Sequence, residues 1–294
     1  MEKKKTRGFG IDKSRDKELQ RLIADYAGKF EQKTYEDDQT GLSINYNLFL
    51  PEHYQNAEKY PLVLFIADAS TVGREVEVPL IQGYGALVWV TEEFQKEFPC
   101  IVAVPQYPEV ILDDHGAYTK TEYVEMTKRL LDDIVHCYAV KESQIYGTGQ
   151  SMGCMATMVL AAKYPELFTA CMLVDGQWDE KELASLSSGT FLYFAAEGDE
   201  KAFKGMQALL SIVKEEAAAI GQIQLNAKWE REEIETAMDG LLEKGKRLNF
   251  ITWEKGSVLP DPLPERPFEH MYSFDPAYKI RAAQRWLFCQ KKEE

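Results

Sequence analysis

Hydrophobic and polar positions alternate in two different periods along most of the chain after about residue 40. Short apolar or alternating runs predict strands, whereas apolar residues spaced three or four apart predict helices. The predicted strands are residues 42–50, 60–67, 100–106, 143–149, 168–176, 190–199 and 248–253. The predicted helices are residues 121–140, 152–165, 201–221, 230–245 and 276–290. Strands that alternate with helices indicate an α/β protein, with a mostly parallel central sheet and helices on both faces.

The same pattern divides the chain of 294 residues into two unequal parts. Residues 1–40 are polar and charged, with a short helical period at 17–30, and predict an N-terminal polar and helical extension. No internal repeat or low-complexity linker interrupts residues 41–294, which therefore predict a single domain. Within it, the helical segments in 201–245 predict a small helical insertion before the last strand.

Charge and composition narrow the class of protein. The net charge of −14 repels phosphate backbones, so nucleic-acid binding is not expected. The five cysteines are widely spaced and form no CxxC pair, which argues against a disulfide framework or a zinc site. No apolar run is long enough to span a bilayer. No signal peptide is visible at the start, so a cytoplasmic location and export after removal of a leader both stay open.

Ser151 lies between two glycines in the G-x-S-x-G sequence Gly149-Gln150-Ser151-Met152-Gly153. A predicted strand ends just before this motif, and an apolar helix begins at Met152. A nucleophile elbow requires a strand, a sharp turn and a helix, and side chains at the glycine positions would collide with the neighbouring elements. The helix N-terminus also favours a developing oxyanion. We therefore predict a nucleophilic serine rather than an ordinary glycine-rich turn.

The base is predicted to be His270. Elbow hydrolases carry serine, acid and histidine in that order, and His270 is the only one of four histidines that follows Ser151. It lies between the last predicted strand and the closing helix, where a loop that carries a base is expected. His136 falls inside a predicted helix, His53 lies in a turn near prolines, and His115 lies in a loop that could line a cleft.

The acid must lie between the serine and the histidine, preferably where a strand ends. Asp199 follows the strand predicted at 190–199 and is the preferred residue. Glu197 precedes it by two positions and could face the same loop. Asp175 follows the preceding strand and is the main alternative, because a carboxylate one strand earlier can also reach the histidine.

Two backbone amides are predicted to form an oxyanion hole. The first is the N–H of Met152, the residue after the nucleophile. The second comes from the loop after the strand at 60–67, and Ala69 is the preferred donor. Asp68 precedes it, and a carboxylate aimed at an oxyanion would oppose catalysis. We therefore expect the Asp68 side chain to point away and to bond to amides of its own loop.

The chain resembles α/β-hydrolases of the polyhydroxybutyrate depolymerase and feruloyl esterase type over about residues 40–290. The resemblance lies in "GLSINYNLFLPEHY", "KYPLVLFIADAS", "YGTGQSMGCMATM", "AAEGDE" and "EHMYSFDPAYKIRAAQRWLFCQ". It implies a serine hydrolase that acts on carboxylic esters, often plant cell-wall acyl groups, with Ser151 as nucleophile, Asp199 as acid and His270 as base. The chain departs from the family at Ala67-Asp68, where the family pattern is His-Gly.

The predicted function is therefore ester hydrolysis through an acyl-enzyme, without a metal or an organic cofactor. The predicted substrate is a small-molecule or oligosaccharide ester, such as a feruloyl or acetyl ester of a plant polysaccharide. Tyr107, Trp178 and Tyr272 lie near the predicted loops, where they could either stack on an aromatic acyl group or pack in the core. A serine peptidase on the same fold and a non-catalytic binding protein that keeps the fold are the two alternatives. The sequence does not set the oligomeric state.

Overall fold

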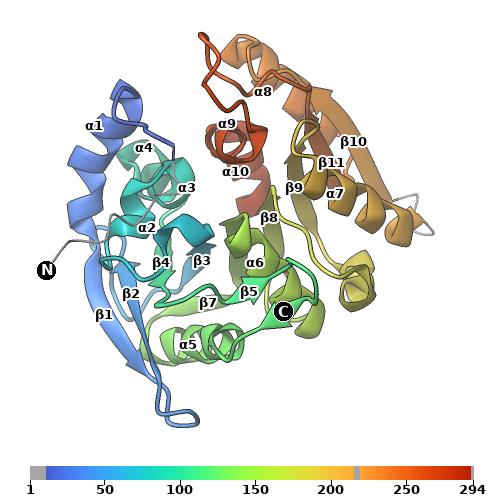
Figure 1. Cartoon of the computed structure of the whole chain (residues 1–294). Helices are drawn as coiled ribbons and strands as arrows, with labels where there is room; N and C mark the ends of the chain where they lie inside the picture. The colour runs from blue at the N-terminus through green and yellow to red at the C-terminus, as the bar shows by residue number, and fades with distance from the viewer. Residues whose placement is uncertain (1–10, 215–218, 293–294) are drawn as a thin grey trace, which may run out of the picture.

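A computed structural model describes residues 11–214 and 219–292 of the chain, and its main strands form one twisted sheet (Figure 1). The order across this nine-stranded sheet is not the order in the chain. From one edge to the other the strands are β1 (Glu31–Glu36), β2 (Ser43–Phe49), β4 (Ile101–Gln106), β3 (Tyr60–Ile66), β7 (Val140–Gln150), β8 (Ala170–Val174), β9 (Phe191–Ala196), β11 (Leu248–Trp253) and β10 (Ile220–Leu225). A separate two-stranded ribbon joins β5 (Leu112–Asp113) to β6 (Thr119–Lys120).

Seven neighbouring strands of the main sheet run parallel to one another, in the order β4, β3, β7, β8, β9, β11 and β10. Strand β2 is antiparallel to both β1 and β4. Parallel neighbours need a crossover connection, and helices provide most of these crossovers. The helices are α1 (Lys17–Tyr26), α2 (Val78–Ile81), α3 (Tyr84–Leu87), α4 (Glu92–Glu97), α5 (Tyr123–Cys137), α6 (Met152–Lys163), α7 (Glu200–Ile212), α8 (Arg231–Leu242), α9 (Phe274–Tyr278) and α10 (Arg281–Cys289).

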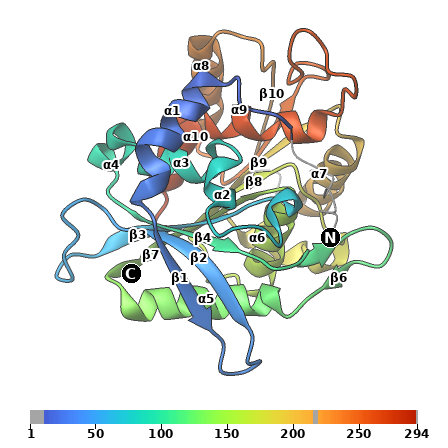
Figure 2. The same cartoon turned by 60° about the vertical axis from the view of Figure 1, so that its left-hand side comes forward.

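The helices cover both faces of the sheet and create two hydrophobic cores. One core joins the sheet to α5, α6 and α7, and the other joins it to α1 to α4 and to α8, α9 and α10. Figure 2 shows α1, α3 and α10 on one side of the sheet and α5 on the other. Strand β3 illustrates the division, because Leu62 and Leu64 enter the first core while Val63 and Phe65 enter the second. This alternation follows from the two-residue repeat of a strand. The predicted α/β-hydrolase fold is confirmed.

Two segments differ from their predicted form. The extension predicted at 1–40 contributes β1, which pairs with β2 along the edge of the main sheet. Its residues are polar and largely exposed, so it carries no apolar alternation from which a strand could be predicted. The segment 201–245, expected to be a helical insertion, contains the edge strand β10 between α7 and α8. The residues that form β10, Ile220–Leu225, lie almost entirely between the two predicted helices, and they pair along the main chain with β11.

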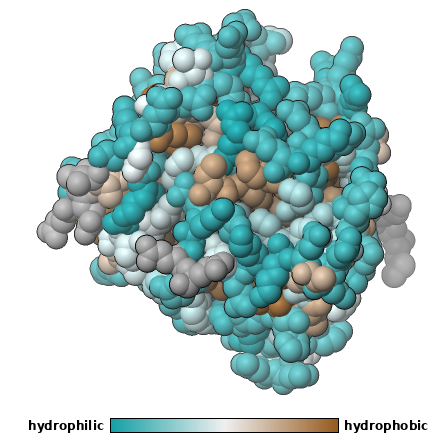
Figure 3. All heavy atoms as spheres, turned by 180° about the vertical axis from the view of Figure 1, so that it is seen from behind, coloured by the Kyte–Doolittle hydropathy of each residue, from teal (hydrophilic) through white to brown (hydrophobic). Residues whose placement is uncertain are grey.

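The surface agrees with the charged composition. Figure 3 shows one face that is largely hydrophilic, with a small group of hydrophobic side chains near its centre. None of the helices in the described part of the chain combines the length and the apolar character needed to cross a membrane.

Candidate active site

The carboxyl ends of the central strands bring three predicted residues to one edge of the sheet. Ser151 follows β7 directly, Asp175 follows β8, and Asp199 lies in the turn between β9 and α7. Parallel strands present their carboxyl ends at the same edge, where open α/β sheets form their sites. His270 reaches this edge from the short 3₁₀ helix η7 (Glu269–Tyr272), which precedes α9.

Ser151 occupies a strained backbone conformation, with φ 53° and ψ −118°. Such a conformation is rare for a residue with a side chain and is kept only when the surrounding structure enforces it. The close packing of α6 against β3 enforces this conformation. At Gly153 a Cβ atom would collide with the carbonyl oxygen of Ile66 at the end of β3. A Cβ on Gly149 would in turn collide with the backbone of Gly153. The strand and helix therefore approach so closely that the serine must lie on a tight bend.

The imidazole of His270 lies between the serine and Asp199. Its Nε2 atom is 2.8 Å from Ser151 Oγ, and its Nδ1 atom contacts Asp199 Oδ2. A neutral imidazole in this setting donates Nδ1–H to the carboxylate and accepts the serine hydroxyl at Nε2. Asp199 is only 2% exposed, and its other oxygen caps α7 by accepting from the amide of Ala202. The acid is thus fixed by the same helix that follows it.

Burial and charge act in opposite directions on His270. Burial lowers the pKa of the imidazole, but the hydrogen bond and the negative charge of Asp199 raise it by more, so the net pKa is raised. Asp68 adds a smaller raising contribution, and Asp175 adds one only in its ionised form. The arrangement therefore stabilises an imidazolium, which is the state that a base reaches when it has taken a proton.

The other acidic candidate near the turn faces away from the imidazole. The Glu197 carboxylate accepts hydrogen bonds from Gln224 and from the amide of Lys255. Asp175 lies behind the pair, fully buried, and is described below.

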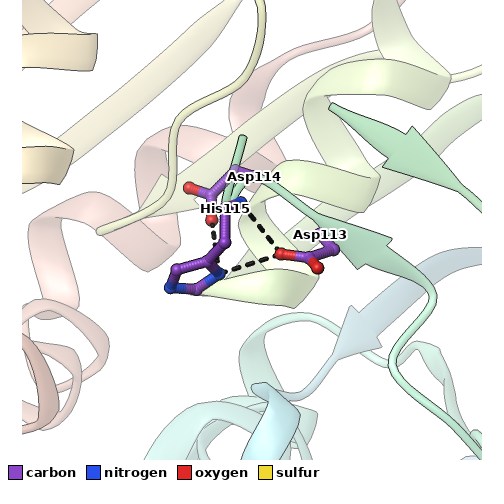
Figure 4. A group of neighbouring side chains, drawn as sticks. All are labelled: Asp113, Asp114 and His115. Carbon is purple, nitrogen blue, oxygen red and sulfur yellow. Dashed lines mark hydrogen bonds and ion pairs between the residues drawn. The ribbon is translucent and has the colours of Figure 1, made fainter. Parts of the chain in front are cut away.

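In the described part of the chain, His53, His115 and His136 make no hydrogen bond to Ser151 or Asp199. Figure 4 shows His115 with its neighbours Asp113 and Asp114, at 2.8 and 3.5 Å from its Nδ1 atom. Asp114 also pairs with the ammonium of Lys201 at 2.6 Å, so a cation of the chain already offsets part of the negative charge of this cluster. His136 is exposed on α5.

Hydrogen bonds in and around the loop after β3 explain how Asp68 is accommodated beside Ala69. Asp68 is 2% exposed and accepts hydrogen bonds from the amide of Ser70 at 2.8 Å and from the side chains of Gln150 and Gln82. Its carboxylate therefore ties the loop to the residue just before the nucleophile. Ala69 and Met152 each begin a helical segment, where the first amides have no intrahelical acceptor. These are the two amides that the sequence predicted as donors.

Sequence reasoning missed Glu269, which precedes the histidine. It is 4% exposed, and its two oxygens accept from the amides of Gly256 at 2.8 Å and Gly198 at 3.2 Å. One carboxylate thus connects the histidine segment to the turn that carries Asp199. A glutamate in a polar loop resembles any solvated acid in sequence, and only the distant glycine amides reveal its role.

The predicted aromatic residues pack in the core. Tyr107 is 3% exposed and shares a hydrogen bond with Thr127, and Trp178 is 4% exposed. Tyr272 is partly buried against the second core. Two other aromatic rings lie beside His270: Phe274 is buried at a centroid distance of 5.1 Å, and Phe268 is 56% exposed at 5.6 Å.

The sheet order, the strained serine and the His270 contacts define an α/β-hydrolase. Residues 38–234 match the family described as "Putative esterase", and the chain belongs to this esterase family. At the level of class, the predicted ester hydrolase is therefore confirmed. None of the curated proteins compared with the sequence matches it.

Solved structures show the same fold. A thermostable esterase has a TM-score of 0.72 at 24% identity, over 90% of this chain and 64% of its own. The feruloyl esterase module of Clostridium thermocellum, solved with sinapinate, has a TM-score of 0.59 at 12% identity, over 90% of this chain and 89% of its own. An S-formylglutathione hydrolase from Agrobacterium tumefaciens has a TM-score of 0.53 at 13% identity, over 90% and 96%.

Proposed function

We propose that the protein hydrolyses carboxylic esters through an acyl-enzyme formed on Ser151, with His270 as base and Asp199 as the acid that orients it. The observation that carries this proposal is the position of one imidazole, whose two nitrogens contact a strained serine and a buried carboxylate. A serine hydroxyl is a weak nucleophile unless a base takes its proton, and this geometry supplies that base.

In the acylation half, Ser151 Oγ attacks the ester carbonyl carbon while its proton passes to His270 Nε2. The negative charge that develops on the carbonyl oxygen is held by the amides of Met152 and Ala69. The tetrahedral intermediate collapses as the bond to the leaving oxygen breaks. His270 returns the proton to that oxygen, which releases the alcohol and leaves an ester on the serine.

In the deacylation half, water takes the place of the alcohol. His270 accepts a proton from the water as its oxygen attacks the acyl carbon, and the same two amides hold the second oxyanion. Collapse restores the serine hydroxyl with the proton held by His270 and releases the carboxylic acid. Asp199 stabilises the imidazolium in both halves without becoming protonated.

For the substrate we propose feruloyl or acetyl esters of plant polysaccharides. The exposed ring of Phe268 beside His270 supports this choice, because it offers a flat apolar surface next to the reacting atoms. The fold is shared with a feruloyl esterase module solved with sinapinate, an aromatic acid. The esterase family favours this activity over the peptidase and the non-catalytic binding protein considered from sequence.

The test combines active-site labelling with a panel of esters. Purified wild type, Ser151→Ala and a control, Ser211→Ala on the exposed side of α7, are incubated with a fluorophosphonate probe. We expect labelling of the wild type and the control only. The proteins are then assayed on p-nitrophenyl acetate, p-nitrophenyl butyrate, methyl ferulate, acetylated xylan and an aminoacyl anilide. Turnover of esters that survives in Ser151→Ala would refute the acyl-enzyme, and preference for the anilide would refute the esterase.

A further inference from the structure

A second carboxyl group lies directly behind the acid and has no place in the reaction as described so far. Asp175 follows β8, is 0% exposed, and adopts a positive φ of 44°. A positive φ is unfavourable for a residue with a side chain, although aspartate and asparagine tolerate it better than most. A buried carboxyl in a strained backbone persists only where its surroundings fix it, and such residues cluster at functional sites.

The contacts of Asp175 lead to the turn that carries Asp199. The Oδ1 atom of Asp175 accepts from the amide of Ala196 at 2.9 Å, at the end of β9. The carbonyl of Ala196 in turn accepts from the amide of Asp199 at 3.0 Å. One residue thus separates the two carboxylates along a continuous chain of hydrogen bonds. A shift of Asp175 would move the turn, and with it the partner of His270.

The side chains of Asp175 and Asp199, both buried, form one compact group with the partly buried His270. One ligand atom from each residue lies within 4.8 Å of the others. The Oδ2 atom of Asp175 is buried and has no hydrogen-bond partner among the described residues. An ionised oxygen in that position would be unfavourable, because the nearby hydroxyl of Ser273 donates to the carbonyl of His270 and so replaces the lost hydration only in part.

The charges around Asp175 also favour its neutral form. Burial raises the pKa of Asp175, and the nearby charge of Asp199 raises it further, although His270, the Ser273 side chain and the amide of Ala196 oppose this in part. Two further titratable groups that interact with it are Cys154 on α6 and Tyr193 on β9. Burial raises the pKa of both well above their usual values, so both are neutral near pH 7 and add no charge.

We propose that Asp175 is a positioning residue for the acid–base pair, which fixes the turn that carries Asp199 and places a neutral carboxyl, rather than a second negative charge, beside His270. The inference rests on the proposed function of the Ser151 group. A second negative charge would strengthen the hold on the imidazolium. The base would then stay protonated at a higher pH and could not accept the serine proton.

The test compares two substitutions at one position. Asp175→Asn keeps the size, the acceptor for the Ala196 amide and the tolerance of positive φ, and it cannot ionise. We expect its kcat/KM on p-nitrophenyl acetate to stay within about threefold of the wild type, with the acid limb of the pH profile unmoved. Asp175→Ala removes the acceptor, and we expect a fall of about 10- to 100-fold in kcat with little change in KM.

Two results would overturn the proposal. A clear downward shift of the acid limb in Asp175→Asn would show that the native carboxyl is ionised and was raising the pKa of His270. A wild-type kcat in folded Asp175→Ala would show that the turn does not depend on it. If Asp175→Ala does not fold, the pH profile of Asp175→Asn alone tests the proposal.

A readout that needs no turnover separates this inference from the proposed function. The Nδ1 proton of His270, bonded to Asp199, is followed by low-field proton NMR against pH in Ser151→Ala and in Ser151→Ala with Asp175→Asn. We expect the same titration midpoint in both proteins, and a lower midpoint with the asparagine would overturn the neutral carboxyl. Absence of ester turnover in the wild type would instead refute the proposed function and leave this measurement valid.

Discussion

The proposed nucleophile Ser151 and its proposed partners His270 and Asp199 occupy two sides of one site that are built in different ways. The serine side consists of β7, the bend and α6, which are contiguous in the chain from Val140 to Lys163. The acid–base side joins the turn at Asp199 to a segment around His270, 71 positions away. The serine side depends on close backbone contacts at two glycines, and the acid–base side depends on hydrogen bonds that backbone amides donate to buried carboxylates.

This difference determines whether a substitution on each side lowers stability or catalytic rate. Two backbones in direct contact leave no space for another atom, so an added methyl group must move a strand or a helix. A hydrogen-bonded turn can loosen by fractions of an ångström and stay folded, and it then loses catalytic geometry before stability. Substitutions on the serine side should therefore change stability, whereas those on the acid–base side should change rate and pH dependence.

The largest expected effect comes from Asp199→Asn, on the acid–base side. Asparagine keeps a side-chain oxygen that can cap α7, so the free energy of unfolding should change little. Its amide can instead donate to Nδ1 of His270, which places the imidazole proton on Nε2 and leaves no acceptor for the serine. We expect kcat to fall by about 10³- to 10⁴-fold, measured by steady-state hydrolysis of p-nitrophenyl acetate.

The pH dependence of kcat/KM tests the same pair, Asp199 and His270. Because Asp199 raises the pKa of His270, the acid limb of kcat/KM should lie above the usual pKa of a free histidine. The stability contributed by this pair is present below the unfolded pKa of the histidine and is lost as pH rises through the higher folded pKa. Loss of the carboxylate should move the residual acid limb downward, and an upward shift in Asp199→Asn would contradict this assignment.

The next largest effect is expected from Gly153→Ala, on the serine side. The new Cβ atom would collide with the carbonyl oxygen of Ile66, which is backbone and cannot rotate away. We expect the free energy of unfolding to fall by about 2–4 kcal/mol in urea denaturation. Gly240→Ala on α8 is the matched control, because a Cβ atom there meets no atom within 4 Å. Helix propensity predicts that the control gains about 0.5–1 kcal/mol. Equal stability of the two variants would refute the steric account of the bend.

The two sides also differ in how far the sequence could predict them. The serine side is local, so the glycine spacing, the strand before it and the helix after it were all visible along the chain. His270 and Asp199 were found by chain order and strand ends, which require only the sheet topology. The bond of Asp68 to the Ser70 amide of its own loop was expected from the sequence and is confirmed. The contacts of Glu269, and the bonds of Asp68 to Gln82 and Gln150, could not be found this way, because their partners are backbone or amide groups more than ten residues away. The polar edge strand β1 carried no apolar pattern at all.

The smallest effect is expected from Glu269→Gln, which tests whether hydrogen bonds hold the acid–base side together. The glutamate accepts two backbone amides with two oxygens, whereas glutamine offers one acceptor and one donor. Either Gly198 or Gly256 then keeps an unpaired N–H, and the histidine segment loosens from the acid turn. We expect kcat/KM on p-nitrophenyl acetate to fall by about tenfold, with a loss of stability of about 1–3 kcal/mol. Glu265→Gln, on the exposed part of the same loop, removes the same charge without a buried bond and should match the wild type. If both variants lose activity equally, the loop charge matters and the hydrogen bonds do not, and the acid–base side would then be held by electrostatics rather than by the geometry of its turn.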